Sequence, residues 1–325
     1  MRRRQFIDAP IALPITVAIS DARAQVESRQ YRVGWLSAQT AASLASSLDV
    51  VRDALASAGY VEGRNLTLVF RFGDDAIERV PTLAAELERI PVDVLMAQGA
   101  AVSVLSTLTL KVPIVYVFSG DPTAAGFADG LAHPLHNMTG LTFMAAELNG
   151  KRLDLLREIL PDLRRVGVIA NPEHPGANLE RGYTEDAAKR LGVTVDYYPT
   201  STREELSRAL DAMRANPPQA LSLFADGFAV AHRERIIEGA ASRRIPVVSG
   251  WPIFARSGAL FTYGPQLEDS YRRLAYYVDR VLKGARPADL PIERPTKFQF
   301  VVNLKTAKSL GITIPPSVLV RAETV

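Results

Sequence analysis

Hydrophobic and polar residues alternate along the chain in a way that predicts short buried strands separated by amphipathic helices. Continuous apolar runs rich in β-branched residues, as at 112–118, predict strands buried on both faces. Apolar residues spaced three and four apart, as over 145–160, predict helices with one apolar face. In the first half, strands are predicted at 31–37, 65–73, 92–99, 112–118 and 138–144, with helices at 42–60, 76–90 and 101–110. This alternation predicts βαβ units and a parallel sheet.

The second half of the chain repeats the pattern. Strands are predicted at 165–172, 193–200, 219–226, 245–251 and 259–265, again with helices between them. Five strands of the same kind thus follow in the same order in each half. We predict an α/β fold with two doubly wound parallel-sheet lobes. Because right-handed crossovers bring the strand carboxyl ends to one edge, two such lobes facing each other enclose a cleft.

Small, polar and aromatic residues occupy the turns that follow the predicted strands. From this position we predict that the ligand is bound by Ser37, Gln39, Gln98, Ser119, Gly120, Asp121, Asn171, Asp226, Trp251 and Tyr263. Hydroxyls and turn amides would hold a carboxylate, Asp121 or Asp226 would pair with an amine, and the Trp251 ring would stack on the ligand. An Asx turn before Pro122 is a second interpretation of Asp121, and packing is the alternative for Trp251.

The chain shows no convincing catalytic or metal-binding motif. Nucleotide-binding, nucleophile-elbow and zinc-protease signatures are missing from the sequence, and the absence of cysteine excludes disulfides and Cys-ligated metals. His133 and His136 flank Pro134 in a stretch typical of a loop. His174 is expected to be a solvated loop histidine, with ligand contact as the alternative. We therefore predict a binding protein that is not an enzyme and uses no cofactor and no metal.

The amino terminus has the pattern of an export signal. Three arginines at 2–4 precede an apolar stretch at 9–20, and Ala22-Arg23-Ala24 fits a cleavage site. Residues 1–24 are therefore predicted to be an export signal, and residues 3–7 also resemble a twin-arginine signal. A disordered basic tail is the alternative. The net charge of +3 does not indicate nucleic-acid binding, which needs a clustered basic face. No later run approaches the roughly 20 apolar residues of a membrane helix.

Several segments carry a family resemblance. Residues 58–65, the Gly120-Asp121-Pro122 turn, 137–143 and 294–322 resemble the bacterial ABC transporter substrate-binding proteins of the tryptophan/tyrosine-binding type. The resemblance implies a type I periplasmic binding fold with a three-segment hinge near 142–146, 264–268 and 288–295. By this mapping, lobe 1 comprises 30–143 and 266–290, and lobe 2 comprises 144–265 and 291–325.

The resemblance also implies a function. It indicates a periplasmic monomer that closes around a small molecule, an aromatic or apolar amino acid or related carboxylate, and delivers it to an ABC permease in the inner membrane. One alternative is a cytoplasmic ligand sensor with the same fold, but the 30 residues before the first strand are too few for a DNA-binding helix-turn-helix. A cleft enzyme with Asp121 as its base is the other alternative.

Overall fold

The computed structural model of the chain describes residues 29–325 except 109, 136, 144, 175 and 225. The predicted export signal at 1–24 and His136 therefore lie outside the described residues. Within the described part, no helix combines the length and the apolar character that a membrane span requires.

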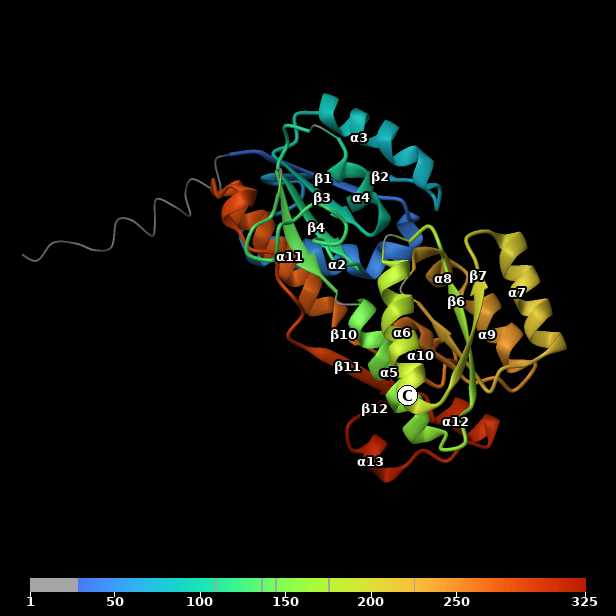
Figure 1. Cartoon of the computed structure of the whole chain (residues 1–325). Coiled ribbons are helices and arrows are strands. Elements are labelled where there is room, and N and C mark those ends of the chain that lie inside the picture. The colour runs from blue at the N-terminus through green and yellow to red at the C-terminus, as the bar shows by residue number, and fades with distance from the viewer. Residues whose placement is uncertain (1–28, 109, 136, 144, 175, 225) are drawn as a thin grey trace, which may run out of the picture.

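Lobe 1 is built on a parallel sheet with the strand order β2-β1-β3-β4-β5 (Figure 1). Its strands are β1 (Tyr31–Ser37), β2 (Leu66–Phe72), β3 (Val94–Gln98), β4 (Ile114–Phe118) and β5 (Met138–Thr142). The helices that follow the first three strands are α2 (Ala41–Ser57), α3 (Val80–Arg89) and α4 (Ala100–Ser106), and a short 3₁₀ turn, η1 (Ile77–Arg79), precedes α3. All five strands are the predicted ones, but α4 is shorter than the predicted helix at 101–110.

Both faces of this sheet are covered, which explains its continuous apolar runs. Successive side chains of a strand point to opposite faces. Trp35 of β1 therefore packs in the core on the side of α2, whereas the next residue, Leu36, packs in the core on the side of α3 and α4. Strands without alternating polar residues are the expected sequence of such a sheet.

Lobe 2 has a larger sheet with the order β12-β11-β10-β9-β8-β6-β7. Its strands are β6 (Arg165–Ala170), β7 (Thr194–Pro199), β8 (Ala220–Leu223), β9 (Val247–Ser249), β10 (Phe261–Pro265), β11 (Phe298–Val302) and β12 (Glu323–Thr324). The five predicted strands, β6 to β10, are parallel. The prediction of five strands in this half was too low, because the chain returns beside β10 and adds β11 antiparallel to it.

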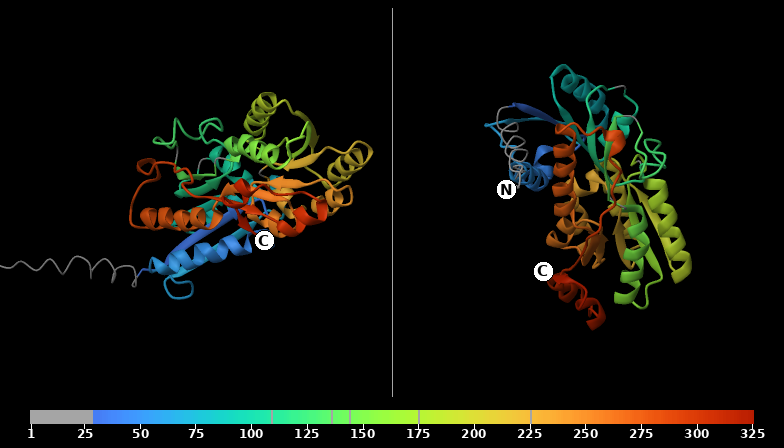
Figure 2. Two further views of the ribbon diagram at one scale, coloured as in Figure 1. Left: turned by 90° about the horizontal axis from the view of Figure 1, so that it is seen from below. Right: turned by 90° about the vertical axis from the view of Figure 1, so that its left-hand side faces the viewer.

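Helices cover both faces of the second sheet as well. They are α5 (Ala145–Ile159), α6 (Ala177–Leu191), α7 (Arg203–Ala215), α8 (Gly227–Ala231), α9 (Arg233–Ala241) and α10 (Pro252–Arg256). The last helices, α12 (Leu304–Leu310) and α13 (Pro316–Leu319), lie at the end of lobe 2 that is remote from lobe 1 (Figures 1 and 2).

Three segments cross between the lobes and are hydrogen-bonded to one another. The chain passes from β5 to α5, from β10 to α11 (Leu267–Leu282), and from the short turn η2 (Pro287–Asp289) to β11. Thr142 N donates to Glu293 O at 2.9 Å, and Gln266 N donates to Lys297 O at 3.0 Å. Arg273 of α11 donates twice to the Glu293 carboxylate, at 2.7 and 2.6 Å, and these bonds lower the pKa of Glu293. The crossing segments therefore form one linked band, and α11 packs back on α2 and β4 of lobe 1.

Candidate functional site

The strand carboxyl ends of the two lobes contact each other directly. Ser119, which follows β4 of lobe 1, lies with its Oγ 2.7 Å from Nε2 of His174, in the loop after β6 of lobe 2. A second contact joins Gln39 of lobe 1 to Gly227 of lobe 2, where a Cβ atom would lie only 3.0 Å from the Gln39 side chain. The lobes thus face each other with the edges at which a parallel α/β sheet binds ligands.

Three of the predicted lobe 1 residues form one polar group at this edge. Ser37 is fully buried, and its Oγ accepts a hydrogen bond from Gln39 N at 3.1 Å. Gln98 Nε2 donates to Gln39 Oε1 at 2.9 Å. The Oε1 atom of Gln98 is buried and has no hydrogen-bond partner among the described residues. A buried acceptor of this kind is costly unless something else satisfies it.

The residues of the turn after β4 lie in different surroundings. Ser119 is buried, but Asp121 is exposed, and its Oδ1 accepts a hydrogen bond from Thr123 N at 2.8 Å. This bond is the Asx turn of the second interpretation of Asp121. At position 120 a Cβ atom would lie 2.8 Å from the buried Phe118 ring, so the close packing of the turn requires Gly120.

The predicted polar residues of lobe 2 also contact each other. Asn171 Nδ2 donates to Asp226 Oδ1 at 3.3 Å, and the other Asp226 oxygen accepts from the backbone N–H groups of Phe228 and Ala229 at the start of α8. Burial raises the pKa of Asp226 to about 6, although the hydrogen bond from Asn171 and the backbone bonds act in the opposite direction. Asp226 is therefore both the cap of α8 and a titratable group at the lobe edge.

The two predicted aromatic residues lie in different surroundings. Trp251 is 9% exposed and packs edge-on against Phe143 of the first crossing segment, with ring centroids 5.4 Å apart. Packing, the alternative to ligand stacking, is thus present for this ring. Tyr263 stacks on Phe298 and contacts Phe300, both of β11, and shares no described contact with the other predicted site residues.

His174 was expected to be solvated, and this expectation is wrong. Its side chain is buried because the loop after β6 is pressed against the Ser119 turn of the other lobe. Nδ1 accepts a hydrogen bond from Gly176 N at 3.1 Å, and burial lowers the pKa of His174 to about 4. The only sequence signal was its position, four residues after a strand end and two before a glycine.

A buried charged residue on α5 was also missed. Arg152 is 1% exposed and lies within the apolar stripe formed by Leu148, Leu155 and Ile159. It donates to the carbonyl oxygen of Tyr263 at 3.1 Å. Burial lowers the pKa of Arg152 to about 10, and the charge of Glu180 opposes this shift. An arginine inside an apolar helical stripe was the signal that sequence reasoning overlooked.

A polar network connects this arginine to the lobe contact. Arg152 also donates to Asn149 Oδ1, and Asn149 Nδ2 donates to Glu180 Oε1 at 3.2 Å. The second Glu180 oxygen lies 3.6 Å from His174 Nδ1. The polar network in the interior of lobe 2 therefore lies beside the residue that contacts Ser119.

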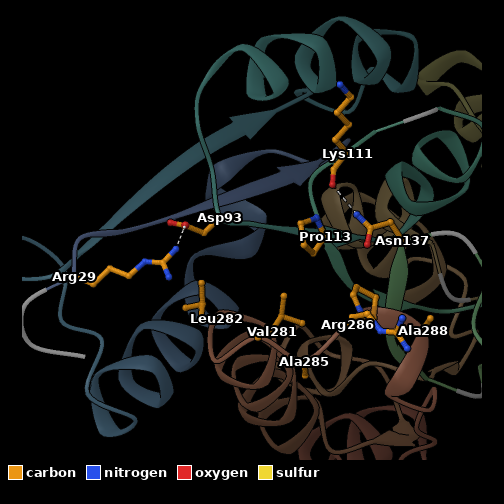
Figure 3. Close-up of a pocket in the computed structure, with 12 residues that line it drawn as sticks. Arg29, Asp93, Lys111, Pro113, Asn137, Val281, Leu282, Ala285, Arg286 and Ala288 are labelled. Carbon is orange, nitrogen blue, oxygen red and sulfur yellow. Dashed lines mark hydrogen bonds and ion pairs between the residues drawn. The ribbon is translucent and has the colours of Figure 1, made fainter. Parts of the chain in front are cut away.

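Away from the lobe contact, the described residues form a surface pocket but no cluster of metal-ligating side chains. No three of the described His, Asp and Glu side chains lie close enough together to hold a metal ion. A surface pocket of about 490 Å³ opens at the opposite end of lobe 1, before β3, β4 and β5, where Arg29 reaches Asp93 at 2.9 Å (Figure 3). None of the ten predicted site residues lines it.

Two α/β lobes that are joined by three crossing segments and meet at their strand ends form the type I periplasmic binding fold. Residues 40–325 match the family described as ABC transporter substrate binding protein. The chain belongs to this family, and the family predicted from the sequence is confirmed.

Known relatives share the fold at low sequence identity. A protein of Clostridioides difficile (strain R20291) named tyrosine-binding protein is 22% identical over 261 residues, which are 80% of this chain and 74% of that protein. A Streptococcus pneumonia structure in complex with L-Trp has a TM-score of 0.84 and 21% identity, covering 91% of this chain and 100% of that one. The ligand-free, open structure of a Clostridium difficile substrate-binding protein with adhesive properties has a TM-score of 0.66 and 19% identity, covering 91% and 99%.

Proposed function

We propose that this chain is the periplasmic receptor of an ABC importer and that its two lobes close around an aromatic or apolar amino acid or a related carboxylate. The direct contact between strand ends of the two lobes carries this proposal, because closure of hinged lobes excludes water from a bound solute. The names of the relatives support the solute class: one is a tyrosine-binding protein, and one structure holds L-Trp.

The relative placement of the lobes supports the interpretation that the structure represents the closed state. The overlap with the L-Trp complex is higher than the overlap with the ligand-free, open structure, at similar sequence identity. We propose that the ten residues predicted from the sequence line the site, together with His174. Within this set, Asp121 contributes through its turn, since its carboxylate already accepts a backbone hydrogen bond.

Export and partner belong to the same proposal. A chain that is cleaved after Ala24 and recovered from the periplasm would distinguish the receptor from a cytoplasmic sensor. The permease would contact the outer rims of both lobes, since closure changes that surface. A monomer with no nucleic acid bound is the expected state of such a receptor.

A thermal-shift series tests the solute class. At 100 times its dissociation constant, a bound solute should add about 2.7 kcal/mol to the free energy of unfolding. We expect this gain for at least one of L-tryptophan, L-tyrosine, L-phenylalanine and L-leucine. If all four leave the melting curve unchanged, the proposed solute class is wrong.

A steric variant tests the role of closure. Gly227→Leu places a larger side chain against Gln39 and should prevent the lobes from meeting, so that the solute no longer shifts the melting curve. Gly182→Leu is the matched control, because position 182 lies on α6 of the same lobe and a Cβ atom there would face open space. Equal solute binding by both variants would contradict binding between the lobes.

A further inference from the structure

Glycines near the contact between His174 and Ser119 let the loops of the two lobes approach each other. Gly120 follows Ser119, and a Cβ atom on it would lie 3.5 Å from the Gly176 Cα atom of the other lobe. Both polar side chains are at most 9% exposed, and the Oγ–Nε2 distance is 2.7 Å. This hydrogen bond is therefore shielded from water. Its direction decides what else the Ser119 hydroxyl can bind.

The partner of Nδ1 decides which nitrogen of His174 carries the hydrogen. Gly176 N–H donates to Nδ1 at 3.1 Å, so Nδ1 is an acceptor. A neutral imidazole has one N–H, which must then be on Nε2. Because burial lowers the pKa of His174 to about 4, the ring stays neutral near pH 7. Nε2–H is thus the donor and Ser119 Oγ is the acceptor.

This direction leaves the hydroxyl hydrogen of Ser119 without a partner among the residues that the structure describes. A serine hydroxyl has one hydrogen and two lone pairs, and here a lone pair is used by His174. Across the described residues, His174 is the only hydrogen-bond partner of Ser119 Oγ. The hydrogen is therefore available to a solute acceptor that binds beside Ser119.

The same residues superficially form a Ser–His–Glu series, with Glu180 3.6 Å from Nδ1. Activation of a serine nucleophile requires the opposite arrangement, in which Nδ1–H donates to the acid and Nε2 accepts the serine hydrogen. The bond from Gly176 to Nδ1 is incompatible with that arrangement. The geometry therefore favours recognition of a solute over attack on it.

We propose that His174 is a specificity-determining residue that acts through Ser119: its Nε2–H occupies the acceptor side of the hydroxyl and commits Ser119 to donate to a carboxylate oxygen of the solute. The inference rests on the proposed function, since it assumes a solute between the lobes. A hydrogen bond to a carboxylate is charge-assisted and stronger than one to a neutral amide. His174 should therefore favour acids over the corresponding amides.

The test compares L-tryptophan with L-tryptophanamide by isothermal titration calorimetry at pH 7.5. His174→Ala and Ser119→Ala should each weaken binding of the acid about ten- to a hundredfold and binding of the amide much less. His174→Gln should restore most of the preference, because its amide N–H can donate to Oγ. The exposed His133→Ala is the matched control and should change neither. Equal losses for acid and amide would overturn the proposal.

A second measurement does not depend on the solute. The ¹⁵N shifts of the imidazole nitrogens, assigned with His174→Gln, report the tautomer in the solute-free protein. Hydrogen on Nδ1 would overturn the proposal whatever the solute is. If Nε2 carries the hydrogen and neither tryptophan compound binds, the aromatic part of the proposed solute class is wrong, and L-leucine with L-leucinamide provides the same comparison.

Discussion

The burial of His174 makes the stability of the folded chain depend on pH in a definite direction. Its pKa is lowered from 6.5 to about 4 by burial. Between these values, the unfolded chain holds a proton on this residue that the folded chain lacks. The free energy of unfolding therefore falls as the pH drops below 6.5, and this contribution levels off below about pH 4.

The size of the effect follows from the two pKa values. Each pH unit between them is worth about 1.4 kcal/mol, so the full contribution is about 3 kcal/mol. At pH 5, the protonation equilibria of the folded and unfolded chain predict a loss of about 2 kcal/mol in the free energy of unfolding. The ring is almost fully buried, so solvent screening does not reduce this value appreciably.

Urea denaturation of the wild type and His174→Gln between pH 4.5 and pH 8 measures this contribution. Other groups titrate in both proteins, so the difference between the two unfolding free energies isolates His174. We expect the free energy of unfolding of the variant minus that of the wild type to be about 2 kcal/mol larger at pH 5 than at pH 8. His133→Gln, at an exposed position, should show a flat difference. A flat difference for His174→Gln, or a gain that grows as the pH rises, would refute the reasoning.

Two further variants have clear expectations. Burial raises the pKa of Asp226 from 3.8 to about 6, so the folded wild type loses stability as the pH rises through that range. Asp226→Asn can still cap α8 but does not ionise. In the same urea series, its free energy of unfolding relative to the wild type should rise by up to about 3 kcal/mol between pH 4 and pH 7. Gly264→Ala would place a Cβ atom 1.9 Å from the Gly250 carbonyl oxygen, so that β9 and β10 must separate; we expect a loss of about 4 kcal/mol or more at every pH, and wild-type stability would contradict the close approach.

The positions of the lobe 1 site residues could be predicted because topology alone fixes them. In a parallel sheet every strand ends at the same edge, so the order of strands need not be known to place Ser37, Gln98 and Ser119 together. The structure brings Ser37 to the backbone N–H of Gln39 and Gln98 to the side chain of Gln39, and it places Ser119 at the other lobe. The pattern of hydrophobic residues was sufficient to predict this part of the fold.

The roles of individual side chains could not be predicted in the same way. Aspartate and asparagine form turns with the same carboxylate or amide that would bind a ligand, and only the folded structure shows that Asp121 and Asn171 each accept a backbone N–H two residues later. The burial of His174 depends on a loop of one lobe meeting a turn of the other, a contact between residues 55 positions apart. β11 was missed because its antiparallel pairing depends on where the third crossing segment returns to the sheet.

The described ionisable groups at the lobe contact carry little net charge near pH 7. A charge that loses water without a partner is costly, and it shifts its pKa toward the neutral form instead. His174 is neutral at pH 7, and deeper in lobe 2 the charge of Arg152 is opposed by that of Glu180. Asp226, with a pKa of about 6, is the exception, and it remains ionised above that pH beside Asn171 and two backbone donors. In the proposed receptor, an ammonium group of the solute on the Asp226 side would compensate this carboxylate, whereas a solute without a positive charge would leave it uncompensated.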